Sequence, residues 1–172
     1  MQILCNAAIT LGRLACVSPD FLNGVAKTGG FIGLWATALS TSTNKAEKTD
    51  GFLGLLSTLN KDLNNCLMGD NMGISNVRGV ILSVASWHVG KERVDEKDDE
   101  DALREMDHDV LHGNRYHFAQ FPNDNPIMVA VGTNVKGLVG TIAQLCGRDE
   151  WHNIKGRLPS NIVRLLSEEY QL

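Results

Sequence analysis

The chain has 172 residues, of which 43% are hydrophobic and 21% charged, with 16 basic residues against 20 acidic ones. This composition excludes a disordered chain, and the net charge of −4 argues against nucleic-acid binding, which needs a basic surface. Four widely spaced cysteines without a Cys-x-x-Cys pair argue against a disulfide scaffold and indicate a reducing, intracellular setting. The longest apolar stretches fall far short of the ~20 residues that a membrane span needs.

Apolar residues recur at the three- and four-residue spacing of helices. The first predicted helix carries an apolar stripe made of Ile3, Ala7, Leu11, Leu14 and Ala15. Ser18 and Pro19 end it, and they are also suited to the N-cap and first position of a second helix. That second helix runs to residue 39. Its glycines weaken it and predict a break near Gly29 and Gly30.

A polar turn over 40–44 leads to a third helix over 46–59. Residues 60–73 are rich in Asn and Gly, which predicts a loop or a frayed helix. A fourth helix over 77–87 follows, with apolar residues at helical spacing.

A fifth helix over 103–111 is predicted to end at Gly113, and 114–126 is predicted to be a loop. The run Ile127 to Val131 is β-prone but continues directly into a helical pattern. The last helix is expected to begin near Pro159.

About seven helices without alternating strands predict an all-α fold. Helix pairs separated by short turns, about one pair per 40–47 residues, are typical of HEAT or armadillo arrays, and the last pairs here would be irregular. A closed helical bundle has the same helical period, so both architectures remain, with the array favoured.

One segment sets the sign of the net charge. Residues 92–109 hold ten acidic and three basic side chains, a charge of −7, which leaves +3 on the rest of the chain. Such a stretch is usually a solvated loop. It could also raise the rate at which basic peptides meet the protein, an effect that salt would weaken.

Six short motifs occur in order along the chain. They are Asn6-Ala7-Ala8-Ile9-Thr10-Leu11-Gly12-Arg13-Leu14; Phe31-Ile32-x-x-Trp35-x-x-x-Leu39; Glu47-Lys48-x-x-x-Phe52-x-Gly54; Val84-Ala85-Ser86-Trp87; Leu103-Arg104-x-Met106 with Leu111-His112-Gly113; and Gly147-x-Asp149-Glu150-Trp151 with Leu158-Pro159. Together they resemble the C-terminal region of the transportin, or karyopherin-β2, family of nuclear import receptors. No single motif is diagnostic, and the order over nearly the whole chain carries the resemblance.

Two alignments with that family are open. The first uses all six motifs, but residues 114–146 then have no good counterpart and form an insertion of uncertain structure. The second matches 136–147 to the family's penultimate helix and treats 89–124 as one acidic insertion. The first rests on more identities and is preferred at this stage. In both, the stretch 60–73 is longer than in the family.

The resemblance implies that residues 1–172 are the last three or four HEAT helix pairs of a longer α-solenoid. It implies a carrier without enzymatic activity or cofactor, which shuttles between cytoplasm and nucleus. Cargo proteins with proline-tyrosine nuclear localisation signals, the Ran GTPase and nucleoporins would be the partners of the full-length receptor. The alternative is a HEAT-repeat scaffold or adaptor subunit without transport activity.

The resemblance also implies two cargo-binding residues, Asn6 and Ile9. An Asn side chain can bond an extended peptide through both its donor and its acceptor, and Ile9 would hold an apolar side chain. The alternative is that Ile9 belongs to the core and Asn6 is an ordinary polar surface residue. Because a repeat normally buries its apolar face against its neighbour, the region from Ile3 to Leu14 is predicted to mediate self-association.

Other chemistries find weaker support. His108 and His112 have the spacing of a zinc motif on a helix, but the intervening Asp109 is shorter than the Glu general base that such a site uses, and no third ligand is evident. The pair Gly132 and Gly137 resembles half of a phosphate-binding loop, but a leucine stands where the lysine belongs. We therefore predict no metal site and no phosphate loop. The tryptophans at positions 35, 87 and 151 are predicted to be core residues.

Overall fold

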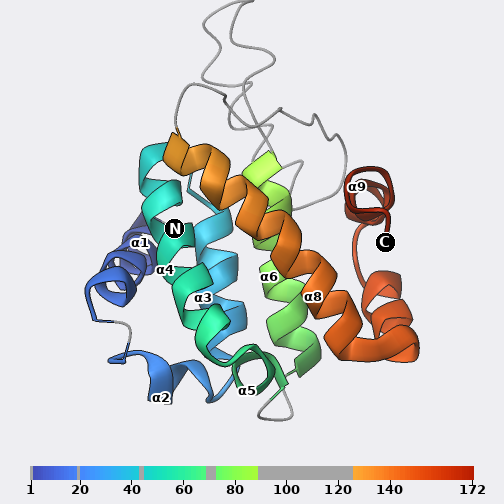
Figure 1. Cartoon of the computed structure of the whole chain (residues 1–172), viewed down its shortest axis with the longest axis horizontal. Coiled ribbons are helices and arrows are strands. Elements are labelled where there is room, and N and C mark those ends of the chain that lie inside the picture. Colours follow the sequence, from blue (N-terminus) through green and yellow to red (C-terminus); the bar gives the residue numbers. More distant parts are fainter. Residues whose placement is uncertain (1, 19, 43–44, 69–72, 89–125) are drawn as a thin grey trace, which may run out of the picture.

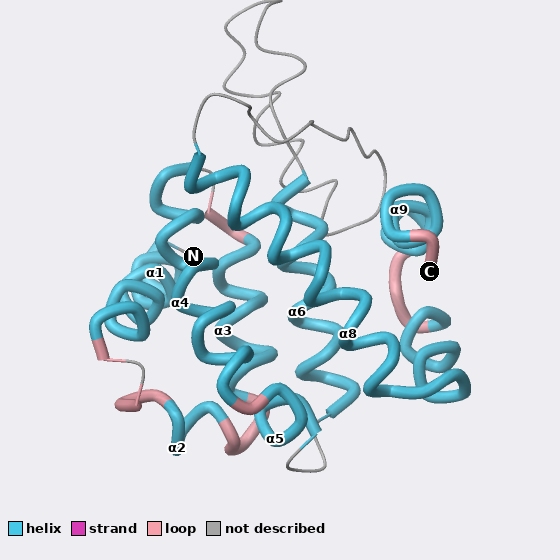
Figure 2. Tube along the Cα trace, in the orientation of Figure 1, coloured by secondary structure: helices cyan, strands magenta, loops and turns pink. Residues whose placement is uncertain are grey.

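The computed structural model describes residues 2–18, 20–42, 45–68, 73–88 and 126–172 (Figure 1). These residues form helices joined by short turns and contain no strand, which confirms the all-α prediction (Figure 2). The helices are α1 (Gln2–Val17), α2 (Asn23–Ala26), α3 (Phe31–Ser40), α4 (Lys45–Lys61), α5 (Leu63–Met68), α6 (Gly73–His88), α8 (Pro126–Gly156) and α9 (Ser160–Tyr170).

Four helices form the centre of the molecule in an alternating pattern. The first, α1, packs mainly along α4, and α3 packs mainly along α6. The long helix α8 crosses α4 and α6, and α9 contacts both α6 and α8 (Figure 1). One hydrophobic core runs through all of them, because each helix turns an apolar face inward. The stripe predicted for α1 is not that face: Ala15 is buried and Leu11 is half-buried, but Ile3, Ala7 and Leu14 are exposed. Its largest fully buried side chains include Phe52, Ile32, Leu39, Leu59, Ile81, Ile142 and Leu165.

Glycines allow the backbones of the paired helices to touch. A Cβ atom on Gly12 would lie 2.5 Å from the Cα of Gly51, and one on Gly54 would overlap the backbone of Gly12. In the second pair, a Cβ on Gly79 would lie 2.5 Å from the carbonyl oxygen of Gly33. Real Cβ atoms do not come so close, so neither contact can form with a larger residue.

The buried side chain of Asn76 links three helices. Its Oδ1 accepts a hydrogen bond of 3.0 Å from the backbone N–H of Gly33, in the first turn of α3. Its Nδ2 donates to the carbonyl oxygens of Leu67 at 3.1 Å and Cys66 at 3.4 Å, in the last turn of α5. Helix ends leave such groups without partners inside the helix, so Asn76 satisfies one end of α3 and one end of α5 at the same time.

Two further contacts join neighbouring helices. The indole Nε1 of Trp35 donates a buried hydrogen bond of 2.8 Å to the carbonyl oxygen of Ala8, which ties α3 to α1. Arg13 and Asp50 form a surface ion pair of 2.9 Å between α1 and α4. Exposed pairs of this kind contribute little to stability, so packing and the buried hydrogen bonds hold these helices.

The connection between α1 and α3 differs in part from the sequence prediction. The break near Gly29 and Gly30 is confirmed, and both adopt the left-handed conformation that glycine favours, with φ of 58° and 71°. The predicted cap at Ser18 is wrong: the Ser18 carbonyl accepts a turn hydrogen bond from Phe21, and α2 begins only at Asn23. Pro19 lies outside the described residues.

In two other segments the sequence signals were mixed, and the structure shows helix in both. Residues 63–68, predicted as loop or frayed helix, form α5, whose Cys66 and Leu67 are buried. The β-prone run 127–131 is helical and forms the start of α8. Its continuation buries a stripe of Val131, Val135, Leu138, Val139 and Ile142. Within the run itself Val131 is buried but Ile127 is 56% exposed, so the run is helical as the start of the longer helical pattern that follows it.

The long helix α8 is broken at one glycine. Gly147 has φ of 73° and ψ of 170°, so a second helical stretch begins at Arg148 in a new direction. Only glycine adopts this conformation without strain. The predicted start of the last helix next to Pro159 is confirmed by α9. Within the described ranges, no helix combines the length and the apolar character that a bilayer crossing requires.

We predict that Gly54→Ala lowers the free energy of unfolding by about 3 kcal/mol, because the new methyl group must push the α1 backbone away. Gly137→Ala is the matched control: a Cβ there meets nothing within 4 Å, so gaining helix propensity should stabilise the chain by about 0.5 kcal/mol. Urea unfolding followed by circular dichroism measures both. Equal midpoints for the two variants would contradict the role assigned to the glycine contact.

We also predict that Asn76→Asp destabilises the chain by about 2 kcal/mol at pH 7, because a carboxylate cannot donate to the α5 carbonyls. Protonation restores a donor and is favoured in the folded state, so the pKa of this Asp is raised on folding and the lost stability returns as the pH falls. Urea unfolding at pH 7 and pH 4 tests the direction. The control Asn64→Asp, at an exposed position of α5, should change little at either pH.

Candidate peptide-binding surface

Helix α1 has one face in the core and one face toward solvent. The inner face carries Cys5, Ala8, Ile9, Gly12 and Ala15, all buried against α3 and α4. The opposite side, which we call the α1 outer face, consists of Ile3, Ala7, Thr10, Leu14 and Val17, all exposed. Their spacing of three and four residues places them in one stripe along the helix.

The α1 outer face is unusually apolar for an exposed helix surface. Ile3 is 84% exposed and Val17 is 85% exposed, and Leu4 beside them is also exposed. The connection and short helix that follow add exposed Phe21 and Val25. Exposed apolar side chains gathered in this way are typical of interaction surfaces. The sequence had limited this face to residues 3–14, and the structure extends it to Val17.

The two predicted cargo-binding residues lie in different environments. Asn6 is exposed, and its side chain makes no hydrogen bond to another described residue. Its backbone carbonyl accepts a hydrogen bond of 2.8 Å from the hydroxyl of Thr10. Ile9 is only 3% exposed and packs in the core. The amide of Asn6 is therefore accessible to a ligand, whereas the burial of Ile9 agrees with the alternative that it belongs to the core. Their role in binding cargo stays a prediction.

Three cysteine thiols have a raised pKa: Cys16 on α1, Cys66 on α5 and Cys146 on α8. Partial desolvation is the main cause at Cys16, which is exposed overall, and the nearby carboxylate of Asp50 raises its pKa further. Burial is also the main cause at Cys66 and Cys146. A raised pKa keeps a thiol protonated at neutral pH, which makes it a poor nucleophile.

The three tryptophans take part in the core, as predicted. Trp35 is 3% exposed and bonded to α1, and Trp87 packs edge-on against Phe52 with ring centroids 5.1 Å apart. Trp151 is also buried.

The structure tests the predicted absence of a phosphate loop and of a metal site only where it describes the residues concerned. The glycines at 132 and 137 lie inside α8, and Leu138 is buried, so this stretch forms no phosphate-binding loop. No group of three or more metal-binding side chains occurs among the described residues. His108, His112 and the acidic segment 92–109 lie outside the described residues.

Compared with protein-family models, curated proteins and solved structures, the chain gives no match.

Self-association through the α1 outer face stays a prediction that can be tested directly. We expect the mass of the chain in sedimentation equilibrium to rise with concentration, because pairing removes Ile3 and Val17 from water. Val17→Asp should shift the equilibrium toward the monomer by about tenfold or more, since a carboxylate is costly to bury in such a contact.

Leu34→Asp is the matched control, because Leu34 is 71% exposed but belongs to α3. It should leave the mass distribution unchanged. An equal effect of both substitutions would mean that association, if present, does not use the α1 outer face.

Proposed function

We propose that the chain is the C-terminal segment of a transportin-type nuclear import receptor, built as a short array of HEAT repeats. The observation that carries the proposal is the spacing of the helix contacts. Gly12 and Gly54, which bring α1 and α4 together, are 42 residues apart, and Gly33 and Gly79 are 46 apart. Both intervals fall within the roughly 40–47 residues of one such repeat.

The way the helices pack on one another also agrees with an array of HEAT repeats. In a repeat array, each helix packs on the equivalent helix of the next repeat, and stability comes from these neighbour contacts. The packing of α1 on α4 and of α3 on α6 has this form. The contact glycines also belong to the motifs that carry the family resemblance: Gly12 to the first and Gly54 to the third.

The position of α8 favours the second of the two family alignments. Residues 126–156 form one helical run, broken only at Gly147, that packs on α4 and α6. In the first alignment, 114–146 is an insertion, which would not be expected to supply core residues such as Val139 and Ile142. In the second, 136–147 is the penultimate helix and 89–124 is the acidic insertion. The buried stripe on α8 supports the second.

In the proposed receptor, α1 contributes to the surface that holds the N-terminal part of a nuclear localisation signal. The exposed amide of Asn6 can pair with an extended peptide backbone through both donor and acceptor. Ile9 positions this part of α1 from the core. Transport between cytoplasm and nucleus, and the dependence on Ran and nucleoporins, belong to the full-length receptor and are part of the same proposal.

The test is titration of the chain into a fluorescein-labelled proline-tyrosine signal peptide, followed by anisotropy. We expect saturable binding, and we expect Asn6→Ala to weaken it about fivefold, the loss of about 1 kcal/mol of hydrogen bonding. Ile9→Asp is unsuitable because a buried carboxylate would unfold the helix packing.

Asn134→Ala is the matched control, since Asn134 is an exposed Asn on α8, away from α1. It should bind the peptide as the unmodified chain does. Equal affinity for a scrambled peptide, or no loss on Asn6→Ala, would contradict the proposal. Absence of all peptide binding would favour a scaffold without transport activity.

A further inference from the structure

An open pocket of about 590 Å³ lies along the part of α8 that follows the break at Gly147. Its described lining consists of Arg148, Asp149, Trp151, His152 and Lys155. The volume is within the range of about 300–1,000 Å³ that small ligands occupy in proteins. The pocket is separate in sequence from the α1 outer face and has no part in the function proposed above.

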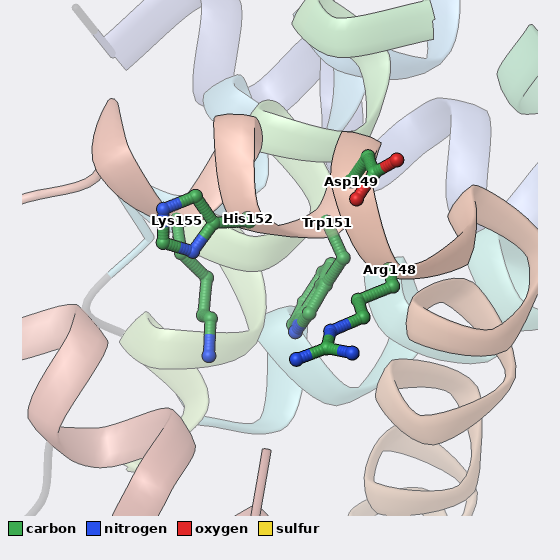
Figure 3. Close-up of a pocket in the computed structure, with 5 residues that line it drawn as sticks. All are labelled: Arg148, Asp149, Trp151, His152 and Lys155. Atoms are coloured by element: carbon green, nitrogen blue, oxygen red, sulfur yellow. The ribbon is translucent and has the colours of Figure 1, made fainter.

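Hydrogen-bond donors gather on one side of this helical stretch. Arg148, Trp151 and Lys155 are spaced three and four residues apart, so they share one face of the helix. Figure 3 shows the guanidinium, the indole nitrogen and the ammonium group extending toward the same side. The carboxylate of Asp149 lies on the opposite side of the helix (Figure 3). Asp149 lines the pocket from that side, and an acidic side chain near the start of a helical segment is favourable.

The indole of Trp151 is a buried donor without an acceptor. The residue is 8% exposed, and its Nε1 has no hydrogen-bond partner. The great majority of buried polar groups in proteins are paired, so such a group needs an explanation. Neither Arg148 nor Lys155 forms an ion pair with another residue in the part of the chain that the structure describes.

We infer that this pocket binds an oxyanion, either a carboxylate or a phosphate group. Arg148, Trp151 and Lys155 supply only donors, so the ligand must supply acceptors, and two of the donors are cationic. The planar guanidinium of Arg148 pairs with two oxygens of one group, and the indole N–H of Trp151 supplies a third hydrogen bond. Arg148 is exposed, and Trp151 is one of the residues that line the pocket.

The experiment uses the 172-residue chain with ¹⁵N-labelled tryptophan, whose three indole N–H signals are resolved by NMR. The probes are three peptides of one sequence that carry Glu, phosphoserine or Gln at the central position. We expect the Glu or phosphoserine peptide to shift the signal of Trp151, identified by its absence in Trp151→Phe, and to leave those of Trp35 and Trp87 in place. Of these two peptides, the one that causes the larger shift identifies the preferred oxyanion. The Gln peptide should cause no shift.

Calorimetry with the stronger peptide tests the residues separately. Arg148→Gln should weaken binding at least tenfold, and Trp151→Phe, which keeps the ring but removes the donor, about fivefold. The matched control is Arg78→Gln on the exposed side of α6, which changes the net charge equally and should leave affinity unchanged within twofold.

Several outcomes would overturn the inference. Equal losses in Arg148→Gln and Arg78→Gln would mean that only the overall charge matters. Equal shifts of all three indole signals, or binding of the Gln peptide as tightly as the others, would exclude recognition of an oxyanion at this pocket. A short RNA that competes better than the peptides would assign the donors to a different class of ligand. Loss of signal-peptide binding on Asn6→Ala would bear on the α1 surface and not on this pocket.

Discussion

The close approach of helix backbones at glycines is the constraint on which the rest of the arrangement depends. Because Gly12 lies directly against Gly51 and Gly54, no side chain separates α1 from α4. The same holds for α3 and α6 at Gly33 and Gly79. At the second contact, the amide of Asn76 on α6 reaches the first turn of α3. A larger residue at that contact would therefore weaken this hydrogen bond together with the packing.

Those same glycines explain both the success and the failure of prediction from sequence. The helical period located α1, α3, α4, α6 and α9, because each buries a stripe along one face. Helix propensity treats a glycine such as Gly54 as a weakness, whereas here it permits the contact that orients two helices. The sequence alone does not show which backbone a glycine will contact, so the structural role of Gly54 could not be predicted from it. The run 127–131 is β-prone by composition, but the helical pattern that continues from it already indicated the helix that the structure shows.

From the sequence, the candidate surface could be assigned to α1 but not to individual residues of that helix. Asn6 and Ile9 are three residues apart, which separates them by only about 60° around the helix axis. The boundary between core and solvent passes between them, and it is fixed by how α3 and α4 meet α1. The helical period had grouped Ile3 with the buried Ala15, and it did not show that Val17 belongs to the exposed stripe. The donor face of Arg148, Trp151 and Lys155 also had a sequence signal in its spacing, but only the unpartnered indole draws attention to it.

Long-range attraction by the overall charge cannot be what gives that donor face its selectivity. The chain carries −4 in total and −7 within 92–109, so the remainder is only slightly basic. At physiological salt, exposed charges more than about 8 Å apart are largely screened, so a weak overall field offers a ligand little attraction from a distance. Recognition must then depend on short-range geometry: a forked guanidinium, a directed indole N–H and an ammonium group on one side of one helix. Such a site discriminates an oxyanion from a neutral amide of the same shape, because the amide presents a donor where the pocket already has donors.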